Sequence, residues 1–247
     1  MEEKKQLDMI NGSIWNKIPL FALPVAATAI LGQLFNAADL AVVGNFTGSA
    51  RNACVAAVGA NSPIIGLVVN LFVGIALGAN VVIAHAIGYG DKKAVKKYVH
   101  TAITTAILAG ILMAILGQIL ASPLLTLLNV PQDVFPLALL YIRIYFAGLP
   151  VILLYNFEAA IFRSIGETKT PLLALSFAGV LNVILNIIFV AFLHMAVEGV
   201  AIATVISNAV SSVILFHKLR HSNREVRVFP RELRIDPESL KRILRIG

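Results

Sequence analysis

Long apolar stretches alternate with short polar connections along the whole chain. Six of these stretches are each long enough to cross the hydrocarbon core of a bilayer as a helix, because about 20 residues suffice. The six stretches cover residues 18–44, 58–87, 95–120, 135–160, 171–193 and 197–217. The pattern therefore predicts an all-α membrane protein with six transmembrane helices.

The basic residues are distributed unevenly between the connections. Of the 20 Lys and Arg residues, all except Arg51 and Arg143 lie before the first stretch, between the second and third or at the very start of the third, between the fourth and fifth, or after the sixth. Connections that are rich in Lys and Arg face the cytoplasm. We therefore expect a multi-pass protein of the cell inner (plasma) membrane with both termini in the cytoplasm.

The composition supports a membrane protein and argues against other classes. Hydrophobic residues make up 58% of the chain and charged residues only 13%, and the mean hydropathy of +0.86 is well above that of a typical soluble domain. The net charge of +7 could indicate a nucleic-acid partner, but the alternating placement of the basic residues argues against one. Cys54 is the single cysteine, so the sequence offers no intramolecular disulfide and no cysteine metal cluster. The polar residues 1–11 and the length of the first apolar stretch predict that no signal peptide is cleaved.

Prolines and small residues refine the predicted helices. Thr170 before Pro171 predicts an N-cap and the start of the fifth helix, because proline is well tolerated at the first helical position. Pro150 predicts a bend in the fourth helix. A stripe of residues spaced by four along the second stretch predicts that another helix can approach closely there. This stripe consists of Gly66, Asn70, Gly74 and Gly78.

The last part of the chain differs from the rest. Residues 1–217 form the predicted six-helix transmembrane lobe, and residues 218–247 are polar and basic, as expected for a cytoplasmic linker. Asp236 followed by Pro237 predicts the start of a new helix. Its basic and aliphatic character repeats that of residues 15–20, so we interpret residues 218–247 as a linker followed by the start of a second, missing lobe.

A single carboxylate, Asp39, lies inside the first apolar stretch. A charged side chain at the centre of a bilayer costs at least about 2.5 to 3.5 kcal/mol, so Asp39 should face the protein interior or a wet cavity. Asn36 lies one helical turn earlier and shares its face. The alternative is that Asp39 lies near the outer end of its helix and is hydrated among the lipid headgroups.

Two pairs of polar residues lie in the last two stretches. Asn182 and Asn186 are four residues apart, as are Thr204 and Asn208, so each pair lies on one helix face. Carboxylate, amide and hydroxyl oxygens suit a hard cation. The same groups also form interhelical hydrogen bonds, worth about 0.6 kcal/mol each in membranes. The spacing alone leaves both interpretations open.

The fourth stretch contains two further charged residues. We expect the guanidinium of Arg143 to extend toward the membrane surface and orient the helix. We expect Glu158 to pair with Arg163, with a position at the mouth of a cavity as the alternative. The sequence contains no nucleophile elbow, phosphate-binding loop or paired catalytic carboxylates, so we expect that the protein is not an enzyme and needs no metal or other cofactor.

Four motifs resemble those of the multidrug and toxic compound extrusion (MATE) transporters. The most specific of them is the element Arg-x-x-Gly-Glu-Thr-Lys-Thr-Pro, and the resemblance covers essentially the whole chain. The motifs are Phe35-Asn36-Ala37-Ala38-Asp39 with Gly44, Ala86-Ile87-Gly88-Tyr89-Gly90-Asp91, Arg163 to Pro171, and Gly199-Val200-Ala201-Ile202-Ala203-Thr204.

The resemblance implies a twelve-helix transporter with two six-helix lobes around a central cavity, of which this chain matches the N-terminal lobe and the inter-lobe linker. It implies a cation site in this lobe, with Asn36 and Asn208 as further candidates for lining the cavity. The implied site residues are Asp39, Asn182, Asn186 and Thr204. Many members of the family have an aspartate where this chain has Asn186, so coupling to a single proton at Asp39 is at least as well supported as coupling to sodium.

The resemblance therefore implies a secondary active antiporter that extrudes small organic cations in exchange for H⁺ or Na⁺. Its partners would be the lipid bilayer, the organic substrates and a second lobe, which another chain could supply. One alternative is a flippase for lipid-linked precursors from the same superfamily, which would need a cationic cavity, whereas Arg143 is the only Lys or Arg embedded well inside a stretch. The other alternative is a truncated membrane protein that does not transport.

Overall fold

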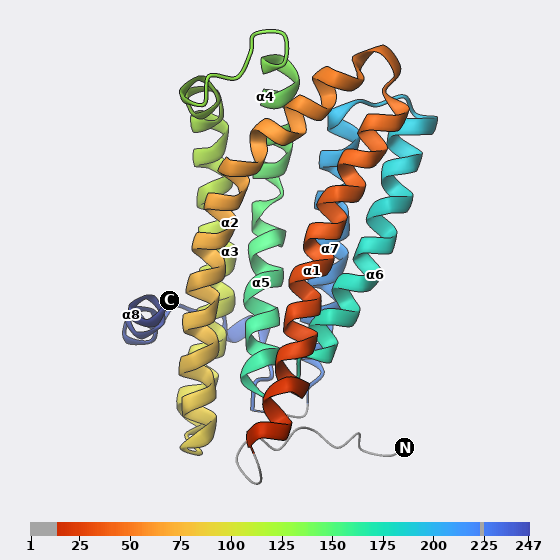
Figure 1. Ribbon diagram of the computed structural model, residues 1–247. Coiled ribbons are helices and arrows are strands. Elements are labelled where there is room, and N and C mark those ends of the chain that lie inside the picture. Colours follow the sequence, from red (N-terminus) through yellow and green to blue (C-terminus); the bar gives the residue numbers. More distant parts are fainter. Residues whose placement is uncertain (1–13, 223–224) are drawn as a thin grey trace.

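The computed structural model describes residues 14–222 and 225–247, and its long helices run side by side as a bundle (Figure 1). The main helices are α1 (Ile14–Phe46), α2 (Arg51–Gly88), α3 (Lys92–Leu127), α4 (Phe135–Ala147), α5 (Leu149–Ser164), α6 (Lys169–Asn186), α7 (Val197–Arg220) and α8 (Pro237–Ile246). Three short elements complete the described chain: the 3₁₀ turns η1 (Gly48–Ala50) and η3 (Pro230–Glu232), and the π-helix η2 (Ile187–Phe192). Residues 1–11, which entered the prediction that no signal peptide is cleaved, lie outside the described part.

The bundle has the dimensions of a membrane domain. Within the described residues, α1, α2, α3, α7 and the continuous span of α6 with η2 are each long and apolar enough to cross a bilayer, and α4 with α5 supplies a sixth, bent span. Large apolar side chains cover the outside of the bundle, for example Leu67, Leu112, Ile119 and Phe177. Helices that satisfy their own backbone hydrogen bonds can face lipid in this way. The all-α fold with six spans is therefore confirmed, and the chain is a multi-pass membrane protein.

Several helices extend beyond the apolar stretches of the sequence. The second helix begins at Arg51 rather than at residue 58, and the third continues to Leu127 rather than ending at residue 120. The predicted start of the fifth helix was wrong, because α6 begins at Lys169 and the Thr170 hydroxyl donates to the Glu167 carboxylate instead of capping the helix. Pro171 still lies within the first turn, where its missing N–H has no partner to lose.

The predicted fourth helix, residues 135–160, is broken into two helices that meet at Gly148 with a bend of 51°. Pro150 accounts for the break, because it lacks an N–H and its ring clashes with the carbonyl four residues earlier. The break packs closely against two neighbours: a Cβ on Gly110 of α3 would lie 2.5 Å from Pro150 Cα, and a Cβ on Gly148 would lie 2.3 Å from Val205 of α7. The predicted bend is therefore present.

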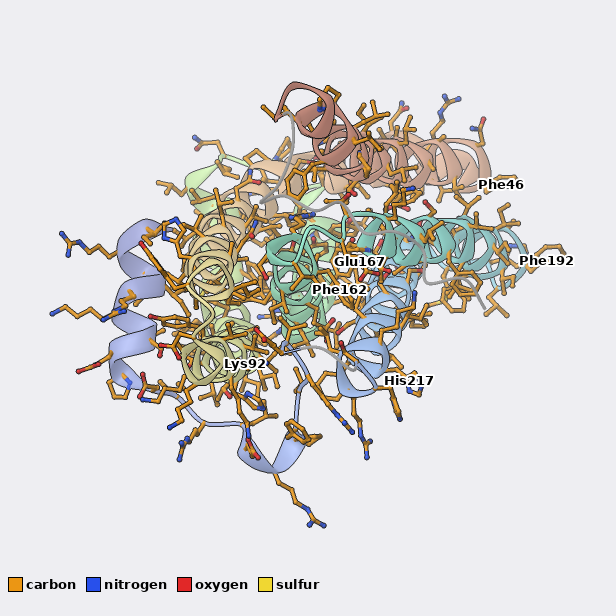
Figure 2. All side chains as sticks on the ribbon, turned by 90° about the horizontal axis from the view of Figure 1, so that it is seen from below. Phe46, Lys92, Phe162, Glu167, Phe192 and His217 are labelled. Atoms are coloured by element: carbon orange, nitrogen blue, oxygen red, sulfur yellow. The ribbon has the colours of Figure 1, made fainter. Side chains whose placement is uncertain are left out.

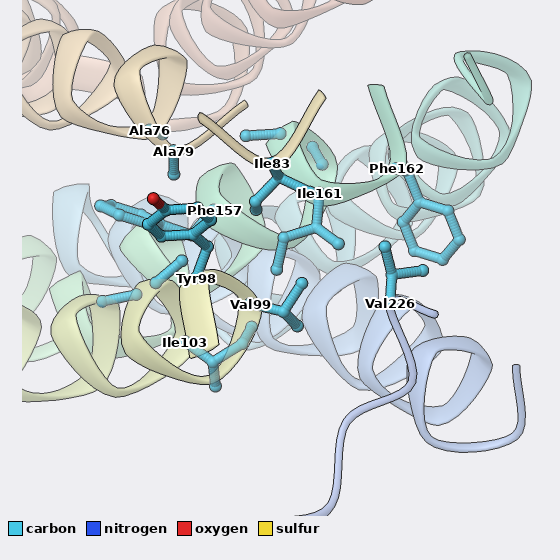
Figure 3. Packing of buried hydrophobic residues seen from close by; sticks show 14 of the residues in the cluster. Ala76, Ala79, Ile83, Tyr98, Val99, Ile103, Phe157, Ile161, Phe162 and Val226 are labelled. Atoms are coloured by element: carbon cyan, nitrogen blue, oxygen red, sulfur yellow. The ribbon is translucent and has the colours of Figure 1, made fainter. Parts of the chain in front are cut away.

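Two hydrophobic clusters hold the bundle together, one toward each end. The cluster at the lower end joins α2, α3, α5 and α7 through residues such as Ile83, Val99, Phe157 and Leu215 (Figure 3). The cluster at the upper end, where α1 meets η1, includes Val43, Cys54, Ile142 and Val200. Close packing at both ends fixes which faces of the helices meet in the middle of the bundle.

The C-terminal segment, residues 225–247, packs against the lower end of the lobe. Val226 and Val228 are fully buried in the lower cluster, and Val226 lies beside Phe162 of α5 (Figure 3). Three ion pairs join this segment to α3, and they lie at the protein surface, where water screens the charges and keeps such pairs weak. They are Lys92–Glu225 at 3.2 Å, Lys96–Glu232 at 2.5 Å and Lys97–Asp236 at 3.8 Å.

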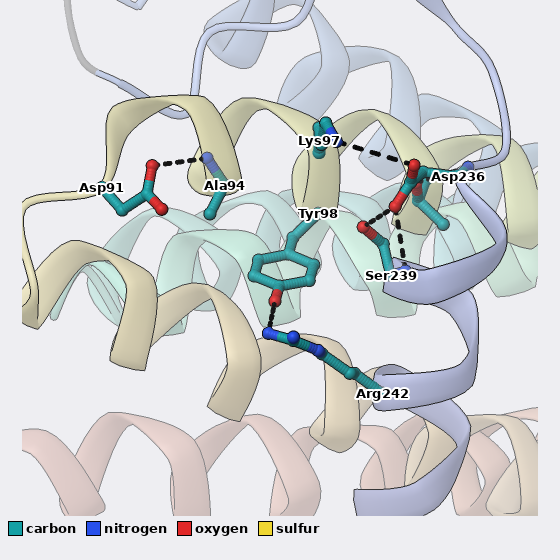
Figure 4. Close-up of polar contacts among 8 residues, drawn as sticks. Asp91, Ala94, Lys97, Tyr98, Asp236, Ser239 and Arg242 are labelled. Carbon is teal, nitrogen blue, oxygen red and sulfur yellow. Dashed lines mark hydrogen bonds and ion pairs between the residues drawn. The ribbon is translucent and has the colours of Figure 1, made fainter.

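The helix α8 begins where the sequence predicts it. The Asp236 carboxylate accepts a hydrogen bond from the backbone N–H of Ser239 at 3.0 Å and from its hydroxyl at 2.6 Å, which caps α8 (Figure 4). These hydrogen bonds lower the pKa of the Asp236 carboxyl below its usual value. Arg242 donates to the Tyr98 hydroxyl of α3 at 2.8 Å, so α8 is held at both its start and its middle.

The end of α8 crosses α2 at the predicted stripe of small residues. A Cβ on Gly78 would lie 2.2 Å from the carbonyl oxygen of Ile243, and a Cβ on Gly74 would lie 3.3 Å from that of Gly247. Among the described residues, no other helix comes within 4 Å of the Cβ position of Gly66, and the atom found there belongs to Asn70 of its own helix. The close approach is therefore confirmed for the lower half of the stripe. Viewed from the lower end, α8 lies at the margin, away from α6 and α7 (Figure 2).

Candidate functional site

The candidate site lies in the upper half of the bundle, where α1 meets α6 and α7. Asp39 is only 3% exposed and lies seven residues before the end of α1, which corresponds to about 10 Å along the helix. Its side chain is enclosed by protein, so the structure favours the interior position over hydration among headgroups.

Both carboxylate oxygens of Asp39 accept a hydrogen bond. The side-chain amide of Asn186 on α6 donates to Oδ1 at 2.5 Å, and the hydroxyl of Thr204 on α7 donates to Oδ2 at 3.2 Å. Asn182 donates to Thr204 Oγ1 at 3.3 Å, and Asn186 donates to Asn182 Oδ1 at 3.1 Å. The structure thus brings together the four residues that were expected to form the site, from three different helices.

Oxygen atoms dominate this cluster. The Oδ1 atom of Asn186 is buried and has no hydrogen-bond partner among the described residues, so it is free to accept or to coordinate. With the Asp39 carboxylate, Asn182 Oδ1 and Thr204 Oγ1, it forms a set of ligands that suits a hard cation or a proton on the carboxylate. No group of three or more His, Cys, Asp or Glu side chains within the described residues could hold a metal ion.

The two further candidates for cavity lining differ in position. Asn208 is half-buried and donates from its amide to the backbone oxygen of Thr204 at 2.9 Å, so it lies directly below the cluster on α7. Asn36 is exposed, and no hydrogen bond among the described residues joins it to Asp39. The structure therefore brings Asn208 next to the site and leaves Asn36 outside it.

A glycine on α6 determines how closely α1 can approach. The Phe35 ring of α1 occupies the space above Gly179, where a Cβ would lie 1.6 Å from the ring. Phe35 lies one turn before Asp39, and Gly179 lies one turn before Asn182 and two turns before Asn186. The notch at Gly179 therefore sets the register in which Asp39 meets its partners.

Replacing Gly179 with valine is expected to separate α1 from α6. Any side chain at this position must displace the Phe35 ring, and overpacking of this kind destabilises by about 1 to 3 kcal/mol. Thermal unfolding of the purified chain should show a lowered Tm, which Phe35→Ala should partly restore in the double variant. Gly32→Ala on α1 is the matched control, because no atom of the described part of the chain lies within 4 Å of its Cβ position. Equal stability of Gly179→Val and the wild type would contradict the proposed notch.

Two tyrosines of α4 lie near Asp39, and the sequence pattern did not single them out. Tyr141 and Tyr145 are one turn apart, and their rings stack with centroids 6.4 Å apart. Both lie within electrostatic range of the Asp39 carboxyl. They lie in an apolar stretch of mixed aromatic and aliphatic residues, where only their spacing of four could have marked a shared face.

The π-helix η2 begins directly after Asn186. The backbone N–H of Leu193 donates to Ile188 O at 3.0 Å, which is the i to i+5 pattern of a π-helix. Such segments often occur next to functional sites in helices. The sequence gives no local signal for it, since residues 187–192 are apolar like the rest of the span.

An ionisable side chain inside a membrane-spanning bundle is typical of the ion pathways of transporters. The fold and the site therefore define a helical membrane transport protein. The family model MatE matches residues 24–188, which is most of the chain, so the chain belongs to the MATE family.

Curated relatives and solved structures agree with this assignment. The chain is 28% identical over 218 residues to "Probable multidrug resistance protein YpnP" of Bacillus subtilis (strain 168), covering 88% of this chain and 48% of the relative. It is 28% identical over 242 residues to "Probable multidrug resistance protein YoeA" of the same organism, covering 95% and 52%. The chain thus spans about half the length of the curated relatives it matches.

Among solved structures, the chain is similar to a multidrug resistance MATE family transporter in its outward-facing conformation. The TM-score is 0.86 and the sequence identity is 26%, and the match covers 100% of this chain and 54% of the transporter. The similarity to an inward-facing MATE transporter gives a TM-score of 0.76 and 25% identity over 97% and 50%. The lobe therefore superposes better on the outward-facing form.

Proposed function

We propose that this chain is the N-terminal lobe of a secondary active antiporter, which couples the entry of H⁺ or Na⁺ at Asp39 to the outward movement of small organic cations. The observation that carries the proposal is the buried Asp39 carboxylate, whose two oxygens are held by residues of two other helices. The multidrug resistance proteins to which the chain is similar support the class of substrate. The MATE family is a family of transporters, which agrees with the expectation that the protein is not an enzyme.

Protonation of Asp39 would change the contacts between the helices. The hydrogen bonds from Asn186 and Thr204 are assisted by the negative charge and are about twice as strong as neutral ones. A protonated carboxyl weakens them and adds a donor. Protonation would therefore change how strongly α1 is held against α6 and α7, and coupling requires that the ion interact differently with the two conformations of the transporter.

The single negative charge of the site favours H⁺ over Na⁺ as the coupling ion. The cluster contains one carboxylate, because Asn186 stands where many members of the family have an aspartate, and its amides already donate into the site. One coupled charge is driven by about 2.3 kcal/mol per 100 mV of membrane potential, which is a usable force for efflux. Nothing in the described structure favours the flippase, since Arg143 is exposed and takes no part in the site.

The coupling ion can be tested in vesicles that contain the transporter with both lobes. We expect an imposed pH gradient, acidic on the side of ion entry, to drive efflux of an organic cation in sodium-free buffer. A protonophore should stop this efflux. Efflux that requires a sodium gradient and ignores the pH gradient would assign the site to Na⁺ and contradict the proton as coupling ion.

We propose that both termini are cytoplasmic, based on the placement of the basic residues. Single cysteines at the exposed positions Lys93 and Arg227 should then react with a membrane-impermeant reagent only from the cytoplasmic side, and one at the exposed Gln132 only from outside. Cys54 is fully buried, so its background labelling should be low. Labelling of Gln132→Cys from the cytoplasm would reverse the orientation.

A further inference from the structure

A second buried carboxyl, that of Glu158 on α5, lies apart from the Asp39 site. Glu158 is 0% exposed and lies six residues before the end of α5, about 9 Å from the lower end of that helix. The predicted pairing with Arg163 was wrong, because no ion pair among the described residues includes Glu158. Its Oε2 instead accepts a hydrogen bond from the Ser212 hydroxyl of α7 at 3.0 Å.

The surroundings of Glu158 do not stabilise a negative charge. Its Oε1 atom is buried and has no hydrogen-bond partner among the described residues. Phe157 and Ile161, its neighbours on α5, belong to the lower hydrophobic cluster (Figure 3). A carboxylate without a cationic partner or a full set of donors is strongly disfavoured in such an interior, whereas a neutral carboxyl is tolerated.

The ionisable groups around Glu158 are few. On its own helix, Tyr155 interacts electrostatically with Glu158 and Arg163, but the Tyr155 hydroxyl donates to Pro171 O at 3.3 Å. The neighbouring helices α2, α3 and α6 contribute Ile83, Val99 and Ala174 to the apolar cluster at this level. Among the described residues, Ser212 of α7 is the polar side chain that contacts Glu158 from another helix.

Polar side chains of α7 lie between the two carboxyls. Thr204 contacts Asp39 and Ser212 contacts Glu158, and these residues are eight positions apart, or about 12 Å along α7. Between them, the hydroxyl of Ser207 is buried without a partner among the described residues, and the hydroxyl of Ser211 lies 3.4 Å from Ala174 O. Hydroxyls both donate and accept, so they can pass a proton along a span that is otherwise apolar.

We propose that Glu158 is a second proton-binding site, the inner of two stations on the path of the coupling proton, with Asp39 as the outer one. The inference rests on the proposed function with H⁺ as coupling ion. Glu158 holds a proton in the closed interior and releases it to cytoplasmic water when the inward-facing form opens the lower end of the lobe. The Asp39 carboxyl then gives its proton to the Glu158 carboxylate by way of the hydroxyls of α7, which leaves Asp39 ionised and Glu158 neutral again.

The protonation state of Glu158 can be observed directly. We expect carboxyl-¹³C NMR of the purified chain, labelled at glutamate only, to show one protonated glutamate at neutral pH. That signal should be lost in Glu158→Gln and retained in Asp39→Asn, since the label does not report on aspartate. Glu238→Gln, at the start of α8, is the matched control and should leave the signal in place. A wild-type chain whose glutamates are all ionised at neutral pH would overturn the inference.

Transport then tests the path itself, in vesicles containing the transporter with both lobes. Glu158→Gln keeps an oxygen that can accept from Ser212, so it should fold. We expect it to lower proton-driven efflux at least tenfold, while Glu158→Asp recovers part of the activity with a shifted pH profile. Wild-type efflux and pH profile in Glu158→Gln, with Asp39→Asn inactive, would overturn the second station and leave the proposed function intact. Proton-driven efflux that survives in Asp39→Asn would overturn both.

Discussion

Replacing Asp39 with asparagine is expected to abolish ion-driven efflux by the transporter that contains both lobes. Asparagine is nearly the same size and still accepts a hydrogen bond from Thr204, but it can neither bind a proton nor carry a negative charge. The site would then have one fixed state, so the ion gradient could no longer drive the conformational change. Gradient-driven efflux of an organic cation from vesicles should fall by more than about a hundredfold, because no other charged group of the cluster can replace the carboxylate.

The variant should still insert and fold, because the lower and upper hydrophobic clusters do not include residue 39. The matched control is Asp91→Asn, which makes the same chemical change at the exposed N-cap of α3, where asparagine caps as well as aspartate. Asp91→Asn should transport like the wild type. Wild-type efflux by Asp39→Asn, with equal amounts of protein in the membrane, would mean that the Asp39 cluster only joins helices.

The six spans could be predicted from the sequence because a bilayer demands long apolar segments, and this demand is local. The exact ends could not, since a helix such as α2 continues past the apolar stretch into polar residues that favour helix equally well. Pro150 predicted a bend, but the complete break at Gly148 depends on how closely Gly110 and Val205 pack there. The docking of residues 225–247 on α3 is likewise a tertiary feature, because the segment is polar enough to read as a free linker.

The composition of the candidate site was predictable, whereas its geometry was not. Polar residues spaced by four stand out in apolar helices, which pointed to α6 and α7, and the family resemblance selected Asp39 with its three partners. The contact itself depends on the notch at Gly179, which the sequence does not distinguish from other small residues. The predicted pairing of Glu158 with Arg163 failed for a simple reason: residues five apart do not share a helix face.

The 247-residue chain reconstituted without a second lobe is expected not to transport. Transporters built from two repeats bind their ligands at the interface between the repeats and alternate by moving one repeat against the other. Here the chain spans about half the length of its curated relatives and of the solved MATE structures. The α1 helix, which carries Asp39, exposes Leu23, Ile30 and Leu34, so one side of the site region is open to lipid or to another protein surface.

The measurement is reconstitution of residues 1–247 in vesicles with an imposed proton or sodium gradient, followed by efflux of an organic cation. No gradient-dependent movement is expected, and coexpression with the second lobe of a MATE relative should restore it. Two copies of the chain could imitate the two lobes, because the lobes of the family are related by a pseudo-two-fold axis, and such a dimer would be detected by cross-linking. The prediction would be contradicted if this chain alone showed gradient-dependent efflux and Asp39→Asn abolished it. The Asp39 carboxylate would then couple transport without a second lobe.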